Sequence, residues 1–308
     1  MGQIAPTAFQ KVVQSVQEIL EVAAGMGIPI SVEVEARCLI QAAYFQEEGR
    51  SLSSFDFYSG AMGEFSPRAA QTALQWARQR ASGIPLQHLT GVQVFGENEY
   101  AVGPEVLIPR PETEILLRSA LVELATRPPR LGLEIGLGSG VLSIELLAYF
   151  PALRILASEL TPAARVLARK NAEKILGNAS DRLQILIADE SAHVWEPFEQ
   201  VGASQADFLI SNPPYLGEVS EVTAEVLAHE PREALFAPPQ DLLFFYREIA
   251  QGARKFIRSS GFVFMEVPHE RASDILKLFK KPQWDARILP DLSQRPRVLI
   301  AKLERANG

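Results

Sequence analysis

The sequence predicts an α/β protein in which a small helical bundle and a β-hairpin precede a doubly wound, mostly parallel sheet. Two observations support this prediction: helical periodicity dominates the first part of the chain, and short apolar runs alternate with helical stretches after residue 111. The chain has 308 residues, which is long for one domain. We therefore expect a helical domain at 1–84, a hairpin linker at 85–110 and a sheet domain at 111–308.

The first domain is expected to contain three main helices. Apolar residues between Phe9 and Leu20 recur with the three-and-four spacing of one helix face. Ser31 is a candidate cap for a second helix over 34–44, and Ser66 before Pro67 favours a third helix over 68–80. Such a bundle carries few reactive side chains, so recognition or mere support is its expected role.

The linker has the pattern of a β-hairpin. Val92 and Val94 alternate with polar residues before a turn near 96–98, and Tyr100 and Val102 continue the alternation after it.

The third domain has the alternating order of a doubly wound sheet. Strands are expected at 131–135, 154–158, 183–188, 207–211, 262–267, 286–289 and 298–303, and helices at 111–126, 141–150, 162–176, 242–258 and 270–279. Strands that are separated by helices run parallel, with helices on both faces of the sheet. The last two strands leave no room for a helix, so we expect an antiparallel hairpin that adds a reversed strand.

Composition argues against several classes of protein. Hydrophobic residues make up 47% and charged residues 22%, and no apolar run approaches the ~18 residues of a membrane span. The N-terminus does not resemble a secretory signal, so we expect a cytoplasmic protein. We also expect a monomer. Cys38 is the only cysteine and the four histidines lack HxxxH spacing, so neither an internal disulfide nor a protein-held metal is expected.

The charge distribution disfavours nucleic acid as a partner. The net charge is −7; residues 1–108 contain eleven acidic and six basic side chains, and the remainder contains 26 and 24. Proteins that bind phosphate backbones cluster Lys and Arg on one face. Neither part of this chain has such an excess.

A glycine-rich turn follows the first strand of the sheet domain. The segment LGLEIGLGSG places Gly136, Leu137, Gly138, Ser139 and Gly140 between a strand and a helix. Glycine allows close backbone approach to a ligand, and the N–H groups at a helix start face outward. The spacing is GxGxG, not the GxGxxG of dinucleotide binding, and on its own it is more typical of an ordinary strand-to-helix turn without a ligand.

Acidic residues close three successive strands at the same edge of the sheet. Glu134 ends the first strand, Glu159 ends the second, and Asp189 with Glu190 follows the third. A carboxylate at the end of the second strand can accept hydrogen bonds from both hydroxyls of a ribose. Acidic strand ends suit a cationic nucleoside cofactor better than a pyrophosphate, which favours S-adenosyl-L-methionine.

The tip of the fourth strand reads SNPPY. This strand should lie beside the first, at the topological switch point where open α/β sheets bind ligands. A primary amide offers two N–H donors, and Asn212 with the Pro213 carbonyl offers two acceptors for them. Pro213 and Pro214 would stiffen the turn, and Tyr215 would pack against a flat amide. The plain alternative is a proline-stiffened turn with a buried tyrosine.

These motifs resemble a known family. GLGSG with SNPPY resembles the Rossmann-like class I methyltransferases, and QHLTG, VFG, LIPRPETE, HEPREAL and DLSQRPRV resemble the release-factor glutamine methyltransferases. The resemblance implies methylation of the glutamine amide nitrogen in the Gly-Gly-Gln motif of class-1 peptide-release factors. It implies cofactor contacts at Gly136–Gly140, Glu159, Glu190 and Asn212, and a substrate loop at Asn212–Tyr215.

Several interpretations stay open at this stage. The substrate is alternatively an adenine or guanine amino group in DNA or RNA, or a glutamine of a ribosomal protein; a non-catalytic binding module is the third possibility. The chain departs from the family pattern at 237–246 and 265–272, and Glu190 stands where an aromatic residue often packs against adenine. His88 is expected to be structural, whereas Arg110, Glu112 and Glu230 suit either the mouth of the site or a structural contact.

Overall fold

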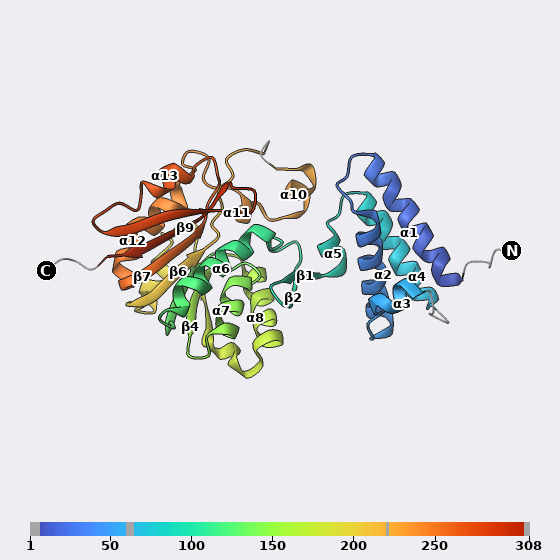
Figure 1. Ribbon diagram of the computed structural model, residues 1–308, viewed down its shortest axis with the longest axis horizontal. Helices are drawn as coiled ribbons and strands as arrows, with labels where there is room; N and C mark the ends of the chain where they lie inside the picture. The colour runs from blue at the N-terminus through green and yellow to red at the C-terminus, as the bar shows by residue number, and fades with distance from the viewer. Residues whose placement is uncertain (1–6, 60–64, 220–221, 305–308) are drawn as a thin grey trace. The chain divides into compact units, whose positions relative to one another are not determined.

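The structure is a computed structural model that describes residues 7–59, 65–219 and 222–304. These residues form two compact units, one within Met1–Val92 and Ala224–His229 and the other within Gln93–Thr223 and Glu230–Gly308 (Figure 1). The outer limits of the expected domains, residues 1 and 308, lie outside the described residues. The separate linker at 85–110 stays a prediction.

The first unit is helical, as predicted. Its elements are α1 (Ala8–Gly25), α2 (Val32–Glu48), α3 (Ser54–Ser59), α4 (Pro67–Ala81), α5 (Leu86–Thr90) and α10 (Ala224–His229). Ser66 accepts a hydrogen bond from the N–H of Ala69 and Pro67 opens α4, so this cap is confirmed. Ser31 lies at the N-cap of α2 but makes no side-chain cap bond. Phe9, Leu20, Ile40 and alanines of α4 fill the core.

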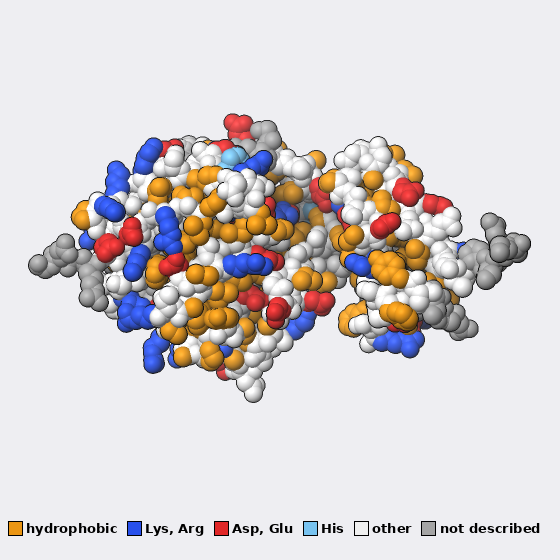
Figure 2. Space-filling view, viewed as in Figure 1, with side chains coloured by type: hydrophobic (Ala, Val, Ile, Leu, Met, Phe, Trp, Pro, Cys, Tyr) orange, Lys and Arg blue, Asp and Glu red, His pale blue; other side chains and the backbone are white. Residues whose placement is uncertain are grey.

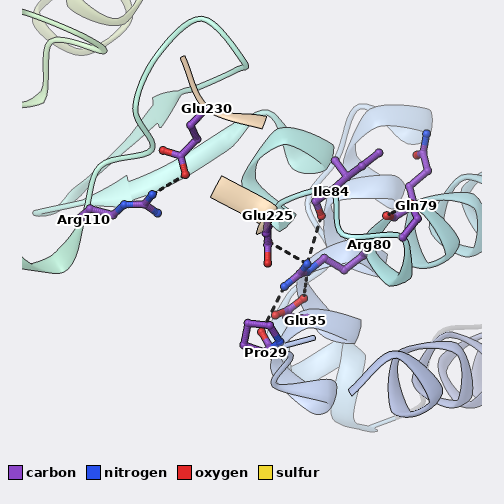
Figure 3. A network of polar contacts seen from close by, with 9 residues as sticks. Pro29, Glu35, Gln79, Arg80, Ile84, Arg110, Glu225 and Glu230 are labelled. Carbon is purple, nitrogen blue, oxygen red and sulfur yellow. Dashed lines mark hydrogen bonds and ion pairs between the residues drawn. The ribbon is translucent and has the colours of Figure 1, made fainter. Parts of the chain in front are cut away.

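Arg80, at the end of α4, joins distant segments inside this unit (Figure 3). Its side chain is 4% exposed; Nε lies 2.7 Å from Glu35 Oε2 and Nη1 lies 3.1 Å from Glu225 Oε1. It also donates to the carbonyls of Pro29 and Ile84. Glu225 belongs to α10, so this ion pair ties a late stretch of the chain to the N-terminal helices.

The predicted hairpin is confirmed. It consists of β1 (Val92–Phe95) and β2 (Asn98–Ala101), whereas Leu86–Thr90, within the expected linker range, forms the helix α5. Gly91 ends this helix in the left-handed conformation, at φ 72°. Leu86 and Leu89, three residues apart, pack on the core of the helical unit, so tertiary contacts favour the helical turn.

The second unit contains a seven-stranded sheet. Its strands are β3 (Leu131–Ile135), β4 (Arg154–Glu159), β5 (Leu183–Ile187), β6 (Ala206–Ser211), β7 (Ile257–Glu266), β8 (Trp284–Pro290) and β9 (Pro296–Leu303). The order is β5-β4-β3-β6-β7-β9-β8. The pairs from β5 to β7 are parallel, and β9 is antiparallel to both of its neighbours. The predicted doubly wound sheet with a reversed C-terminal strand is confirmed.

Helices cover both faces of this sheet (Figure 1). On one face α6 (Pro111–Ala125), α7 (Val141–Tyr149) and α8 (Pro162–Leu176) pack against residues such as Phe208 and Ile210. On the other face α9 (Glu196–Gln200), α12 (Phe244–Phe256) and α13 (Ala272–Leu276) pack against residues such as Leu209. Alternate residues of β6 therefore point into opposite cores, which explains its continuous apolar run. The short helices η1 (Gly177–Arg182) and α11 (Arg232–Leu235) lie in connections.

We predict that Arg80→Ala destabilises the helical unit by about 3–5 kcal/mol, because it leaves the Glu35 carboxylate desolvated without its cation. Hydrogen exchange of amides in α1, α2 and α4 measures this local free energy of opening. Arg78→Ala is the matched control, because Arg78 is exposed on the same helix and its loss should change the free energy by less than about 0.5 kcal/mol. Equal effects of the two changes would contradict the assigned role of Arg80.

Candidate active site

A cavity of about 570 Å³ opens at the carboxyl ends of β3, β4, β5 and β6. Its size lies in the range of small-ligand sites. The cavity brings together most of the residues singled out in the sequence: Glu134, Gly136, Leu137, Gly138, Ser139, Glu159, Asp189, Glu190, Asn212, Pro213 and Pro214 all line it. The glycine turn and the Asn-Pro-Pro tip are adjacent because β3 pairs directly with β6.

The glycine turn exposes backbone to the cavity. Gly136 and Gly138 have φ of 77° and 55°, and a Cβ built on either would meet no atom within 4 Å. Side chains rarely adopt such φ values, and here the space they leave is open cavity. Gly140, at φ 87°, starts α7 and does not line the cavity; a Cβ there would come within 2.9 Å of Ile144. Gly140 thus serves the packing of the turn.

Glu159 presents a buried carboxylate at the end of β4. The side chain is 8% exposed, Oε2 accepts a 2.8 Å hydrogen bond from the N–H of Gly138, and Oε1 accepts a 2.9 Å bond from the N–H of Thr161. Each carboxylate oxygen has capacity for a further donor. The two backbone bonds therefore hold Glu159 in place to accept from a ligand's hydroxyls.

Glu134 lies deeper, at the end of β3. The side chain is 1% exposed and its Oε2 accepts a hydrogen bond from Ser143 Oγ on α7. Burial raises the pKa of Glu134 to about 8. A cationic ligand group beside this carboxyl would favour the ionised form.

The acids after β5 are less constrained than those after β3 and β4. Asp189 and Glu190 are exposed at the rim of the cavity. Asp189 Oδ1 accepts hydrogen bonds from Ser191 N and Oγ, which lowers the pKa of Asp189. Asp189 therefore also shapes the turn.

The tip of β6 divides its side chains between the cavity and the core. Asn212, Pro213 and Pro214 line the cavity, whereas Tyr215 packs against the apolar core below α12. Burial raises the pKa of Tyr215 to about 12. Asn212 Nδ2 donates to Thr113 Oγ1 at 3.3 Å. The expected stacking of Tyr215 on an amide stays a prediction.

Contacts of the remaining motif residues favour structural roles. Glu230 is 5% exposed and accepts bonds from the Ile108 N–H at 3.0 Å and from Arg110 Nη2 at 2.5 Å (Figure 3). This pair fixes the segment before α11 to the start of α6. His88 lies in the helical unit with its ring centroid 6.4 Å from that of His229.

The cavity also contains residues that the sequence patterns did not single out. Thr113 lines it from the first turn of α6, His193 and Val194 from the loop after β5, and Phe244 and Phe245 from the start of α12. The phenylalanines lie in the segment that departs from the family pattern. They supply aromatic surface to the cavity, which Glu190, in place of the aromatic residue common in the family, does not. Backbone N–H groups, buried carboxylates and aromatic rings in one cavity fit the chemistry of S-adenosylmethionine, a cationic nucleoside.

Two classes of feature are not found in the described part of the chain. No three His, Cys, Asp or Glu side chains gather there as a metal site would require. None of the helices described there combines the length and apolar character that crossing a membrane requires.

Comparison with known proteins identifies relatives along almost the whole chain. A release factor glutamine methyltransferase of Deinococcus radiodurans is 33% identical over 286 residues, which are 92% of this chain and 94% of that protein. The enzyme of the same name from Mycolicibacterium smegmatis is 36% identical over 224 residues, 72% of this chain and 76% of that protein. No protein-family profile matches the chain.

Among solved structures, the hMettl16 catalytic domain in complex with the MAT2A 3′UTR hairpin 6 aligns with a TM-score of 0.50 and 16% identity. The alignment covers 79% of this chain and 84% of that one, and it supports the methyltransferase fold. The similarity to curated relatives, together with a glycine turn and an Asn-Pro-Pro tip in one cavity, shows that the chain belongs to the release factor glutamine methyltransferase family.

Proposed function

We propose that this protein uses S-adenosylmethionine to methylate the side-chain amide nitrogen of a glutamine in class-1 peptide-release factors, within their Gly-Gly-Gln motif. The observation that carries the proposal is the shared cavity: the glycine turn with Glu159 and the acceptor-bearing tip at Asn212 line the same space. The names of the relatives support the choice of substrate.

The residues of the cavity divide into two groups with different tasks. Gly136, Gly138 and Glu159 form the part that would hold the cofactor, because they offer open backbone and hydroxyl acceptors. Bound S-adenosylmethionine supplies an electrophilic methyl group on a positively charged sulfur. Asn212 and the Pro213 carbonyl form the part that would hold the amide.

An amide nitrogen is a weak nucleophile because its lone pair is delocalised into the carbonyl group. The protein must therefore orient the nitrogen toward the methyl group, and such positioning is worth several kcal/mol. Two oxygen acceptors hold the two N–H bonds of the amide and stabilise positive charge that develops on the nitrogen. Pro213 and Pro214 have no backbone N–H, so the tip presents acceptors without competing donors.

The surface charge supports a protein substrate over nucleic acid. In the face shown in Figure 2, basic side chains of the sheet-containing unit are scattered among acidic and apolar ones. The net charge of −7 does not favour a phosphate backbone. The tip itself would accept from an exocyclic amino group of a base as well as from an amide, so the substrate must be tested directly.

The test is methyl transfer from labelled cofactor to release factor, ribosomes, DNA and RNA in parallel reactions. We expect one methyl group on the glutamine of the Gly-Gly-Gln motif, located by peptide mass spectrometry. Label on a ribosomal protein or a nucleic-acid base, with an unmodified release factor, would overturn the proposal.

Asn212→Ala should lower methyl transfer by at least about a hundredfold, because the amide loses an acceptor that acts in the transition state. Cofactor affinity, measured by calorimetry, should change by less than about threefold since the glycine turn and Glu159 remain. A large loss of cofactor affinity with normal turnover at saturation would reverse this assignment.

Glu159→Gln should weaken cofactor binding about ten- to a hundredfold, because charge-assisted hydrogen bonds to ligand hydroxyls are lost. Turnover at saturating cofactor should fall less. Glu173→Gln is the control, because Glu173 is exposed on α8 and does not line the cavity. Equal losses for both variants would show that Glu159 has no special role.

Glu134 makes cofactor binding depend on pH. A ligand cation beside this carboxyl lowers a pKa that burial has raised to about 8, so binding at pH 7 should release part of a proton from Glu134. Calorimetry in buffers with different ionisation enthalpies counts the protons, and Glu134→Gln should release fewer than wild type. Affinity should rise from pH 6 to about 8 more steeply in wild type than in the variant. The same count in both proteins would contradict the pairing.

A further inference from the structure

A buried chain of hydrogen bonds runs from β7 to the tip of β6 through the start of α6. Thr113 Oγ1 donates to Glu266 Oε2 at 2.8 Å, and Asn212 Nδ2 donates to Thr113 Oγ1 at 3.3 Å. Thr113 is 3% exposed and Glu266 is 2% exposed. Three elements that are distant in sequence thus meet at the side chain that faces the cavity.

The chemistry of these three groups determines which way the amide of Asn212 points. A threonine hydroxyl has a single hydrogen, and an ionised carboxylate can only accept. While Glu266 is ionised, the hydrogen of Thr113 is directed to it, so Thr113 can only accept from Asn212. Only the NH₂ group of Asn212 can satisfy this bond, which leaves Oδ1, in the same plane on the other branch of the amide, available to a ligand.

We propose that Thr113 and Glu266 are positioning residues that hold Asn212 with its oxygen toward the substrate amide. This inference rests on the proposed function, because it concerns the acceptor that would receive the N–H of a glutamine. With the amide of Asn212 turned by 180°, its NH₂ group would meet the NH₂ group of the substrate. Donor would then face donor, and the hydrogen bond would be lost.

The charge state of Glu266 controls this arrangement. Burial raises the pKa of Glu266 to about 7, while Arg297 on β9 and Arg110 before α6 oppose the rise and Glu112 adds to it. Tyr215 and Tyr246 also lie in the field of this carboxyl, and Tyr246 Oη donates to the backbone carbonyl of Glu266. Once Glu266 takes up a proton it can donate to Thr113 Oγ1. The hydroxyl hydrogen of Thr113 is then free to point at Asn212, and the preference for one amide orientation disappears.

The first test needs no cofactor or substrate. The side-chain NH₂ resonances of Asn212, assigned by their loss in Asn212→Ala, should titrate near pH 7 in the free wild-type protein. They should not titrate in Glu266→Gln, and in Thr113→Val their exchange with water should become faster. Resonances that keep the same titration and exchange in both variants would overturn the inference.

The second test measures methyl transfer to release factor. Thr113→Val should lower kcat about ten- to a hundredfold, because Asn212 loses the hydrogen bond that orients its amide. Thr113→Ser keeps the hydroxyl group and should retain most of the activity. Cofactor affinity should stay within about threefold. Below pH 7, wild-type kcat should fall as Glu266 is protonated, and Glu266→Gln should lack this part of the profile.

Matched controls separate positioning from folding. Thr126→Val changes an exposed threonine at the other end of α6, and Glu270→Gln changes an exposed glutamate just after β7; both should behave as wild type. If the wild-type protein methylates release factor and Thr113→Val is equally active, the positioning inference is refuted but the proposed function stands. A wild-type protein that leaves release factor unmodified would refute the proposed function, whereas the resonance test would still report on the hydrogen-bond chain.

Discussion

The site depends on the pairing of β3 with β6 at the point where the order of the sheet reverses. The register Glu134↔Ile210 brings the ends of these strands to the same height, so the glycine turn after β3 and the Asn-Pro-Pro tip after β6 open into one cavity. Crossovers to opposite faces of the sheet leave this edge free of covering helices. A shift of the register by one residue would turn the apolar residues of β6 into the wrong cores, so the packing of Phe208, Leu209 and Ile210 secures the geometry of the site.

Two buried carboxylates at the same edge of the sheet act against stability when they ionise. Glu134 is 1% exposed and Glu266 is 2% exposed, and burial raises the pKa values of both. A raised pKa in the folded state means that stability decreases as pH rises from the unfolded value near 4.5 through the folded value, about 8 for Glu134 and about 7 for Glu266. Apolar residues of similar size would remove this penalty. The proposed roles, Glu134 beside a ligand cation and Glu266 behind Thr113 and Asn212, give a reason for these acids.

Local patterns were sufficient to predict the parallel sheet, the glycine turn and the proline-stiffened tip. Each depends on residues close in sequence: apolar runs, glycines that need positive φ, and prolines that lack an N–H. The bond from Thr113 to Glu266 spans 153 positions and that from Arg80 to Glu225 spans 145, so no periodicity could reveal them. The single-turn helix α5 is too short for a helical repeat to stand out, and tertiary packing decides its conformation. The direction of the Tyr215 side chain likewise depends on tertiary packing, here against the core that contains residues of α12.

The segment that follows the tip is closed at its base by backbone hydrogen bonds. Leu216 N donates to the Leu235 carbonyl and Ala237 N donates to the Leu216 carbonyl, each at 3.0 Å, so the chain returns beside the point where it left the cavity. Glu230, on the returning part of this segment, forms an ion pair with Arg110. The helix α10, in the middle of the segment, belongs to the helical unit, where Glu225 pairs with Arg80. Because backbone hydrogen bonds close the base of this segment, substitutions in its outer part need not move Asn212. The geometry of the proposed amide-binding tip therefore does not depend on the residues of that outer part.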